Sequence, residues 1–187
     1  TGVAIRDVVL FQKPGPGFRP RFAVGARLLR ADPEHGFYHY LLAAPLQPGA
    51  RTALEFDLLD APGGVLGLGR DTAVVGNGTF FSNEALPHVG YQPRYELEDN
   101  RDRRRHGLSP KERMAARDSE AARANSYLAN DADWIRFDAV VSTSPDQTVV
   151  APGTLEQEWM SGGRRWFHYK SEKPMLNFYT FQSARYE

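Results

Sequence analysis

Hydrophobic and polar positions alternate along most of this chain, which is the pattern of half-buried β-strands. In the run that starts at Phe22, the side chains of Phe22, Val24, Ala26 and Leu28 would share one face of a strand. Phe37 to Ala43 is almost continuously apolar and predicts a strand buried on both faces. Six runs suggest strands: 22–28, 37–43, 54–58, 135–141, 166–170 and 176–183.

Glycine and proline separate these runs at short intervals. The chain has 17 glycines and 13 prolines, many of them adjacent, as at Pro48-Gly49 and Pro152-Gly153. The last two runs are joined by the turn sequence Ser171 to Pro174. Many short strands with frequent turns predict an all-β fold, an antiparallel β-sandwich or saddle.

One segment breaks the strand pattern. Residues 96–125 are crowded with charges of both signs, and their apolar residues are mostly alanine. Ser109 can cap a helix, Pro110 suits the first helical position and Glu112 completes a capping box. The sequence therefore predicts a charged helical insertion with one surface helix from about Ser109 to Asn125.

Composition narrows the possible functions. The chain of 187 residues has a formal net charge of +0 and a pI near 6.9, so we expect no electrostatic binding of nucleic acid. A hydrophobic fraction of 41% is enough for a core, and the absence of cysteine excludes disulfides and thiolate metal ligands. No run approaches the roughly 18 apolar residues of a membrane span, so we expect no membrane insertion by this segment. We expect residues 1–187 to be one β-domain excised from a larger protein.

Two motifs resemble ligand sites. His35 and His39 are four residues apart, which is a metal-ligand spacing on a helix, but in a strand they would lie roughly 13 Å apart. We interpret them as a turn histidine beside a strand histidine. Gly63 to Arg70 is glycine-rich but lacks the Lys and Ser/Thr of a phosphate-binding loop, so it predicts a hairpin or bulge.

The aromatic residues leave an alternative open. Trp134, Trp159 and Trp166, with eight tyrosines, could form a platform for sugars. Aromatic side chains at strand positions are more often part of a core, so the core is the preferred interpretation.

Three stretches, in this order, resemble the N-terminal β-domain of the aminopeptidase N family of zinc metallopeptidases, the gluzincin aminopeptidases. They are similar above all to the bacterial type fused to an ABC-type permease membrane region. The stretches are Asn77 to Phe81 with Leu86 to Tyr91, Trp134 to Asp138 running to Pro152 to Leu155, and Arg165 to Tyr169 with Lys173 to Met175 and Phe178 to Tyr186. The resemblance covers about residues 54–187.

The resemblance implies a non-catalytic domain. In this family the zinc-binding H-E-x-x-H and the G-x-M-E-N signature follow the β-domain, and neither occurs in this chain. Zinc would therefore belong to the parent's following domain, with no cofactor in this chain. The β-domain would pack on that catalytic domain, flank its peptide cleft and be a soluble segment of a membrane-anchored bacterial protein.

Four residues are candidates for facing the cleft: Asn83, Glu84, His88 and Tyr91. Glu84 suits the α-ammonium group of a peptide, because an anion favours that cation. Two alternatives remain open. One is a β-sandwich module that binds peptide or glycan, and the other is a scaffold domain that assembles a transporter-linked parent.

Overall fold

The chain folds into antiparallel β-sheets, which confirms the all-β prediction. The computed structural model describes residues 3–12, 18–59, 73–90, 92, 96–111, 114–123 and 134–186. The glycine-rich run 63–70 lies outside these residues. The strands are β1 (Ile5–Phe11), β2 (Arg19–Phe22), β3 (Ala26–Asp32), β4 (Phe37–Leu46), β5 (Leu54–Asp57), β6 (Val74–Val75), β7 (Gly78–Ser82), β8 (His88–Val89), β9 (Trp134–Ile135), β10 (Asp138–Thr143), β11 (Thr148–Val150), β12 (Thr154–Ser161), β13 (Arg164–Lys170), β14 (Met175–Leu176) and β15 (Thr180–Ala184).

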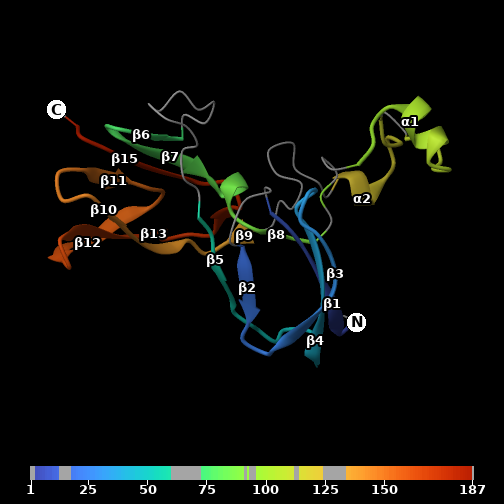
Figure 1. Ribbon diagram of the computed structural model, residues 1–187, viewed down its shortest axis with the longest axis horizontal. Coiled ribbons are helices and arrows are strands. Elements are labelled where there is room, and N and C mark those ends of the chain that lie inside the picture. Colours follow the sequence, from blue (N-terminus) through green and yellow to red (C-terminus); the bar gives the residue numbers. More distant parts are fainter. Residues whose placement is uncertain are drawn as a thin grey trace.

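The sheets form two groups, seen on opposite sides of Figure 1. The first group contains a four-stranded sheet, β3-β4-β1-β8, and the two-stranded ladder β2-β5. The second contains a four-stranded sheet, β11-β15-β7-β6, and a three-stranded sheet, β10-β13-β12. A short ladder, β14-β9, adjoins the second group near the middle of the molecule.

The main hydrophobic core lies in the second group. Its five buried members are Phe137, Val149, Phe167, Tyr169 and Phe181. Phe167 and Tyr169 alternate along β13, so both point to the same face, and the Tyr169 hydroxyl donates to the Val149 carbonyl at 2.7 Å. This hydrogen bond lets a phenol lie in the core without an unpaired polar group.

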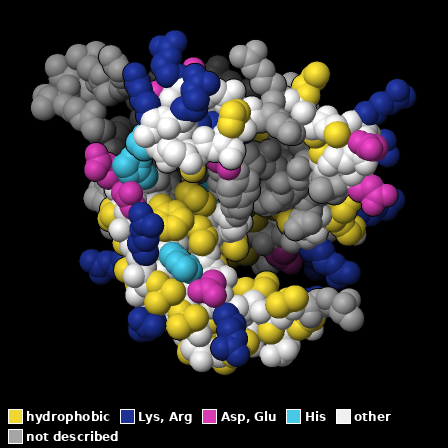
Figure 2. All heavy atoms as spheres, turned by 90° about the vertical axis from the view of Figure 1, so that its right-hand side faces the viewer, with side chains coloured by type: hydrophobic (Ala, Val, Ile, Leu, Met, Phe, Trp, Pro, Cys, Tyr) yellow, Lys and Arg dark blue, Asp and Glu magenta, His cyan; other side chains and the backbone are white. Residues whose placement is uncertain are grey.

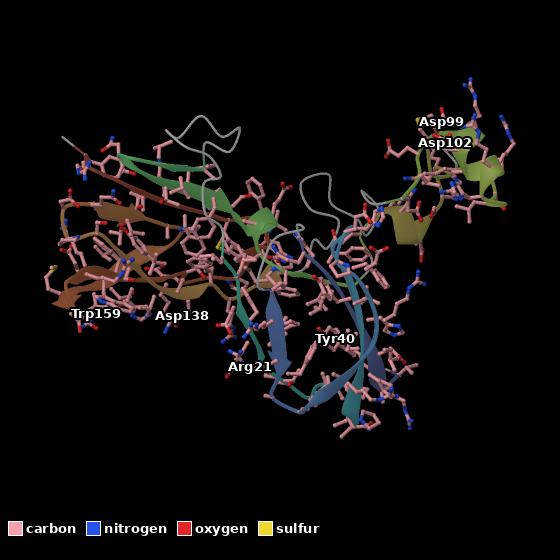
Figure 3. All side chains as sticks on the ribbon, in the orientation of Figure 1. Arg21, Tyr40, Asp99, Asp102, Asp138 and Trp159 are labelled. Atoms are coloured by element: carbon pink, nitrogen blue, oxygen red, sulfur yellow. The ribbon has the colours of Figure 1, made fainter. Side chains whose placement is uncertain are left out.

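The first group is built around β4, as the apolar run at Phe37 predicts. β4 lies between β3 and β1, and Tyr40 and Leu42 are buried on its inner face. Tyr40 points toward β2 (Figure 3), and its ring centroid is 5.3 Å from that of Phe22. The other face of β4 is half-buried rather than fully covered, which corrects the expectation of burial on both faces.

The single strand predicted at 22–28 is wrong, because a turn divides it into β2 and β3. Gly25 has a φ of +74°, in the region that favours glycine, and its N–H donates to the Phe22 carbonyl. The Gly25 carbonyl then accepts from the Ala43 N–H. The apolar alternation from Phe22 to Leu28 therefore continues through a turn.

Two other predicted strands are also interrupted. The run at 135–141 is divided between β9 and β10, because the Phe137 backbone bonds to Ser171 instead of to a neighbouring strand. The run at 176–183 is divided between β14 and β15, where the Phe178 N–H donates to the Leu176 carbonyl. At Phe137 a long-range pair with Ser171 replaces the ladder pair, and at Phe178 a local hydrogen bond replaces it.

The charged insertion contains two short helices among the described residues, and only the second lies within the range that we predicted. Helix α1 (Asn100–Arg105) begins after Asp99, whose carboxylate accepts from the backbone N–H groups of Arg101 and Asp102. Helix α2 (Glu120–Arg123) is preceded by Ser119, whose hydroxyl accepts from the Ala122 N–H.

The predicted start at Ser109 is wrong. Residues 108–111 have no regular structure; the Ser109 carbonyl accepts from Arg103 Nε, and the Lys111 N–H donates to Asn100 Oδ1. These contacts turn the chain back onto α1 and leave no helix at Ser109. Asn125, the predicted helix end, lies outside the described residues.

Candidate functional site

The segment Ser82–Val89 links the two groups of sheets and contains three of the four candidate cleft residues. β7 pairs with β15 in the second group, and β8 pairs with β1 in the first. Between them lies a 3₁₀ turn, η2 (Asn83–Ala85), which the Ser82 hydroxyl caps by accepting from the Glu84 N–H at 3.3 Å. The candidates therefore lie where the chain passes from one group to the other.

Asn83 is held against the second group. Its backbone N–H donates to the Tyr179 carbonyl, and its Nδ2 donates to the Asn177 carbonyl, both at 2.9 Å. Its Oδ1 is buried and accepts no hydrogen bond from the described residues. In this arrangement Asn83 supports the turn rather than facing solvent.

Glu84 and His88 differ in their surroundings. Glu84 lies at the centre of the 3₁₀ turn and is exposed. His88 is half-buried in β8, opposite Phe11 of β1, and its Nε2 is buried. Of the three described candidates, Glu84 is the exposed one, and its side chain is a carboxylate. Tyr91 lies outside the described residues.

Gln12 belongs to this junction and was missed by the sequence analysis. It follows β1, it is 3% exposed, and its Nε2 donates to the Ala85 carbonyl at 3.0 Å. Its Oε1 is buried and accepts no hydrogen bond. Gln12 is separated from Ala85 by 73 residues, and a lone glutamine at a strand end gives no signal of such a long-range contact.

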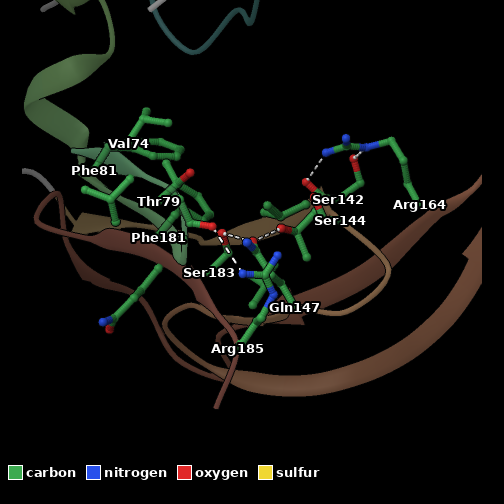
Figure 4. A pocket seen from close by; sticks show the side chains of 17 residues that line it. Val74, Thr79, Phe81, Ser142, Ser144, Gln147, Arg164, Phe181, Ser183 and Arg185 are labelled. Atoms are coloured by element: carbon green, nitrogen blue, oxygen red, sulfur yellow. Dashed lines mark hydrogen bonds between the residues drawn. The ribbon is translucent and has the colours of Figure 1, made fainter. Parts of the chain in front are cut away.

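A cleft of about 410 Å³ lies in the second group, between the sheets β11-β15-β7-β6 and β10-β13-β12 (Figure 4). Phe81, Val141, Val149 and Phe181 supply its apolar wall. Hydroxyl groups line much of the rest, from Thr79, Ser142, Thr143, Ser144 and Ser183. Its size is that of a small-molecule site.

Gln147 organises the polar part of this cleft. It is 8% exposed, and its Oε1 accepts from the Thr143 hydroxyl at 2.8 Å and from the Ser183 hydroxyl at 3.1 Å. Its Nε2 donates to the Asn77 carbonyl at 3.2 Å. One buried amide therefore connects three segments that are far apart in the sequence.

Among the described residues that line the cleft, two are arginines and none is acidic. Arg185 is neutralised by Asp146 and also donates to the Gly76 carbonyl. Arg164 donates from Nε to the Ser142 hydroxyl and from Nη2 to the Ser142 carbonyl, each at 2.8 Å. No ion pair to Arg164 is formed by the described residues, so its charge is available to an anion.

His35 and His39 each pair with a carboxylate. His35, in a turn, contacts Asp32 at 3.0 Å, and His39, in β4, contacts Asp7 at 3.1 Å. This confirms the interpretation of a turn histidine beside a strand histidine. Within the described part of the chain, no three His, Cys, Asp or Glu side chains lie together as metal ligands.

The three tryptophans do not form the expected core. Trp159 and Trp166 pair across β12 and β13 and stack with centroids 5.9 Å apart and planes 13° apart. They are half-buried, and Trp159 lies on the same outer side of the group as Asp138 (Figure 3). Trp134 is 70% exposed and belongs to the separate ladder β14-β9.

Comparison with protein-family models, curated proteins and solved structures found no match to this chain. In the ranges that the structure describes, no helix is long and apolar enough to cross a bilayer. The function must therefore be inferred from the residues and their geometry.

Proposed function

We propose that this chain is the non-catalytic N-terminal β-domain of an aminopeptidase N-like zinc metallopeptidase. In this proposal the parent is membrane-anchored and carries an ABC-type permease region. The chain packs on the catalytic domain that follows it and forms one wall of the peptide cleft.

One observation carries the proposal: the separate stretches that resemble the family meet in a single core. Phe81 comes from the first stretch, Phe137 from the second, and Phe167 and Tyr169 from the third. Phe81 contacts Phe181 with ring centroids 5.1 Å apart, and Phe137 contacts Phe181 at 5.8 Å. Residues that pack together must be compatible in shape, so a resemblance spread over one core supports common descent better than scattered motifs do.

The proposal places zinc outside this chain. Hydrolysis at zinc needs about three protein ligands and an open position for water, and the described residues offer no such cluster. The chain would contribute by limiting access to the peptide terminus and by presenting charge to it.

Glu84 is the residue that we assign to the peptide's α-ammonium group. It is exposed at the centre of a capped turn, and Asn83 fixes that turn through two hydrogen bonds to the second group. Asn83 would act as a positioning residue, because its Oδ1 is buried and cannot reach a ligand in this arrangement.

The outer face of the sheet β3-β4-β1-β8 suits packing on another domain. Pairing places Val9, Phe11, Phe37 and Leu41 on this face, together with the His39–Asp7 pair. Figure 2 views the molecule from this side, where hydrophobic side chains gather and are bordered by Lys and Arg. An apolar centre with a charged rim is typical of interfaces.

The test is Glu84→Gln in the full-length parent, with Glu156→Gln as the matched control, since Glu156 is exposed on β12. Hydrolysis of an aminoacyl p-nitroanilide with a free amine should show a KM raised about tenfold by Glu84→Gln, as for loss of one charge-assisted contact. The control should be unchanged. An unchanged KM would exclude Glu84, and a parent that shows no zinc-dependent peptide hydrolysis would contradict the proposal itself.

A further inference from the structure

The cleft described above combines three kinds of group that a carboxylated sugar requires. It has hydroxyl groups around its polar part, an apolar wall and one arginine without a carboxylate partner among the described residues. It includes none of the junction residues Asn83, Glu84 and His88, so the inference is independent of the function proposed for them.

The hydroxyl groups retain hydrogen-bonding capacity. Thr143 and Ser183 donate their hydrogens to Gln147, which leaves oxygen lone pairs free to accept. The Ser142 hydroxyl accepts from Arg164 and keeps its own hydrogen to donate. A ligand rich in hydroxyl groups can satisfy both kinds of site.

The polar groups are also fixed in position. Gln147 is buried and makes three hydrogen bonds, so Thr143 and Ser183 are held in one arrangement without a ligand. A preorganised site loses less conformational entropy on binding than a flexible one. The arrangement in Figure 4, with hydroxyls on two facing sheets, therefore favours a rigid cyclic ligand.

The positive charge of Arg164 favours an anionic ligand in the cleft. None of the described residues that line the cleft is acidic, and Arg185 is already paired with Asp146, so Arg164 carries the charge that remains for a ligand. Its two bonds to Ser142 fix the planar guanidinium, which matches a carboxylate geometrically.

We propose that this cleft binds a hexuronate-type sugar acid. The carboxylate would bind Arg164, the ring hydroxyls would bond to Thr79, Ser142, Ser144 and Ser183, and the C–H face of the ring would lie against Phe81 and Val141, the half-buried members of the apolar wall. The volume of about 410 Å³ lies within the range of small-molecule sites.

The test is a titration of the whole ¹⁵N-labelled chain with three matched sugars, followed by NMR. The sugars are glucuronate, glucose and glucosamine, which differ in charge but share a ring. We expect saturable shifts with glucuronate at the amides of Thr79, Gln147 and Ser183. Glucose should bind at least about tenfold more weakly, the ratio for one charge-assisted bond, and glucosamine more weakly still.

Three variants complete the test. Arg164→Gln should bind glucuronate and glucose equally, and Thr79→Val should weaken both sugars while keeping the preference for the acid. Arg27→Gln, an exposed arginine in the first group, should behave as the unaltered chain. The spectra themselves show that each variant is folded.

Several results would overturn the proposal. They are absence of saturable shifts, equal binding of glucuronate and glucose by the unaltered chain, shifts confined to residues outside the cleft, or retention of the preference for the acid by Arg164→Gln. Equal loss of binding in Arg27→Gln would also overturn it, because that result would mean that overall charge rather than Arg164 selects the ligand.

Discussion

Gly153 lies directly against the backbone of Lys170, so that a β-carbon on Gly153 would fall 2.4 Å from the Lys170 carbonyl oxygen. Gly153 also has a φ of +91°. It occupies the turn between β11 and β12, and Lys170 ends β13. Two independent constraints, one conformational and one steric, therefore require glycine at this position.

Gly153→Ala should strongly destabilise the chain. The positive φ alone costs about 1–2 kcal/mol for a residue with a β-carbon, and displacement of the Lys170 backbone adds to this, for a total of at least about 3 kcal/mol. Unfolding in urea measures the decrease in the free energy of unfolding. Gly49→Ala is the matched control, because Gly49 has a φ of +80° but no atom within 4 Å of an added β-carbon. Equal losses in the two variants would show that the close approach to Lys170 is unimportant.

The buried Gln147 should contribute more to the free energy of unfolding than an exposed glutamine on a strand of the same group. Gln147→Ala leaves the Thr143 and Ser183 hydroxyls and the Asn77 carbonyl without their partner, which should cost about 2 kcal/mol. Gln157→Ala, at an exposed position of β12, should cost less than about 0.5 kcal/mol. Unfolding in urea compares them. A double-mutant cycle with Ser183→Ala should give a non-zero coupling energy, and additive losses would contradict the network.

Asp32 and His35 form a pH-dependent pair at the β3–β4 turn. The hydrogen bond to Asp32, followed by attraction between the charges, raises the pKa of His35 above its ordinary 6.5. The hydrogen bond to His35 lowers the pKa of Asp32 below 3.8. The His35 contribution to stability is lost as the pH rises through its folded pKa, and the Asp32 contribution is lost as the pH falls through its own. The pair therefore stabilises the turn at pH values between the folded-state pKa of Asp32 and the folded-state pKa of His35.

NMR titration of the His35 ring should place its midpoint above 6.5, and Asp32→Asn should lower that midpoint. Glu34→Gln is the control, because Glu34 has the smallest of the raising effects on the His35 pKa and should change the midpoint much less. A midpoint that is insensitive to Asp32→Asn would exclude the pair in solution.

The helix boundaries of the insertion can be tested by their caps. Asp99→Ala removes the carboxylate that accepts from two N–H groups of α1, so it should destabilise this helix by about 1 kcal/mol. Amide exchange at Arg103 to His106 measures the local change. Ser109→Ala should leave those amides unaffected, because Ser109 contacts α1 through its carbonyl. Equal effects of the two substitutions would restore the predicted helix start.

The sequence predicted those strands that correspond to one uninterrupted run of apolar or alternating residues. β4 and β5 appear near their predicted positions, because the apolar run of β4 and the alternation of β5 are uninterrupted and a turn bounds each of them. The break at Gly25 was missed because apolar alternation continues through the turn, and a positive φ cannot be read from alternation. The helix of the insertion was misplaced because two sets of capping residues compete. Ser109 and Glu112 favour a helix that starts at Ser109, whereas Asp99 and Gly107 favour a helix that starts after Asp99 and ends before Gly107.

The structure explains why the second signal prevails. Gly107 has a φ of +69° and follows α1, and the Leu108 N–H donates to the Arg103 carbonyl. This is the Schellman pattern, which ends a helix and satisfies its last carbonyls. A charged segment without an apolar stripe has little packing to decide between two possible helices, so the caps decide.

The candidate sites were predictable only in part. Glu84 was selected for its negative charge, which suits an α-ammonium group, and it is exposed on a capped turn. The contacts of Gln12 with Ala85 and of Gln147 with Asn77 join residues 73 and 70 positions apart. Such pairs depend on which strands become neighbours, and a pattern along one strand contains no information about that choice.

The order of strands in the sheet β11-β15-β7-β6 has a consequence for synthesis of the protein. β7 pairs with β15, so its edge stays open on the ribosome until residues 180–184 have emerged, about a hundred residues later. Throughout that interval the edge of β7 that will pair with β15, which includes Phe80 and Phe81, lacks its partner, and such an open edge favours association between nascent chains.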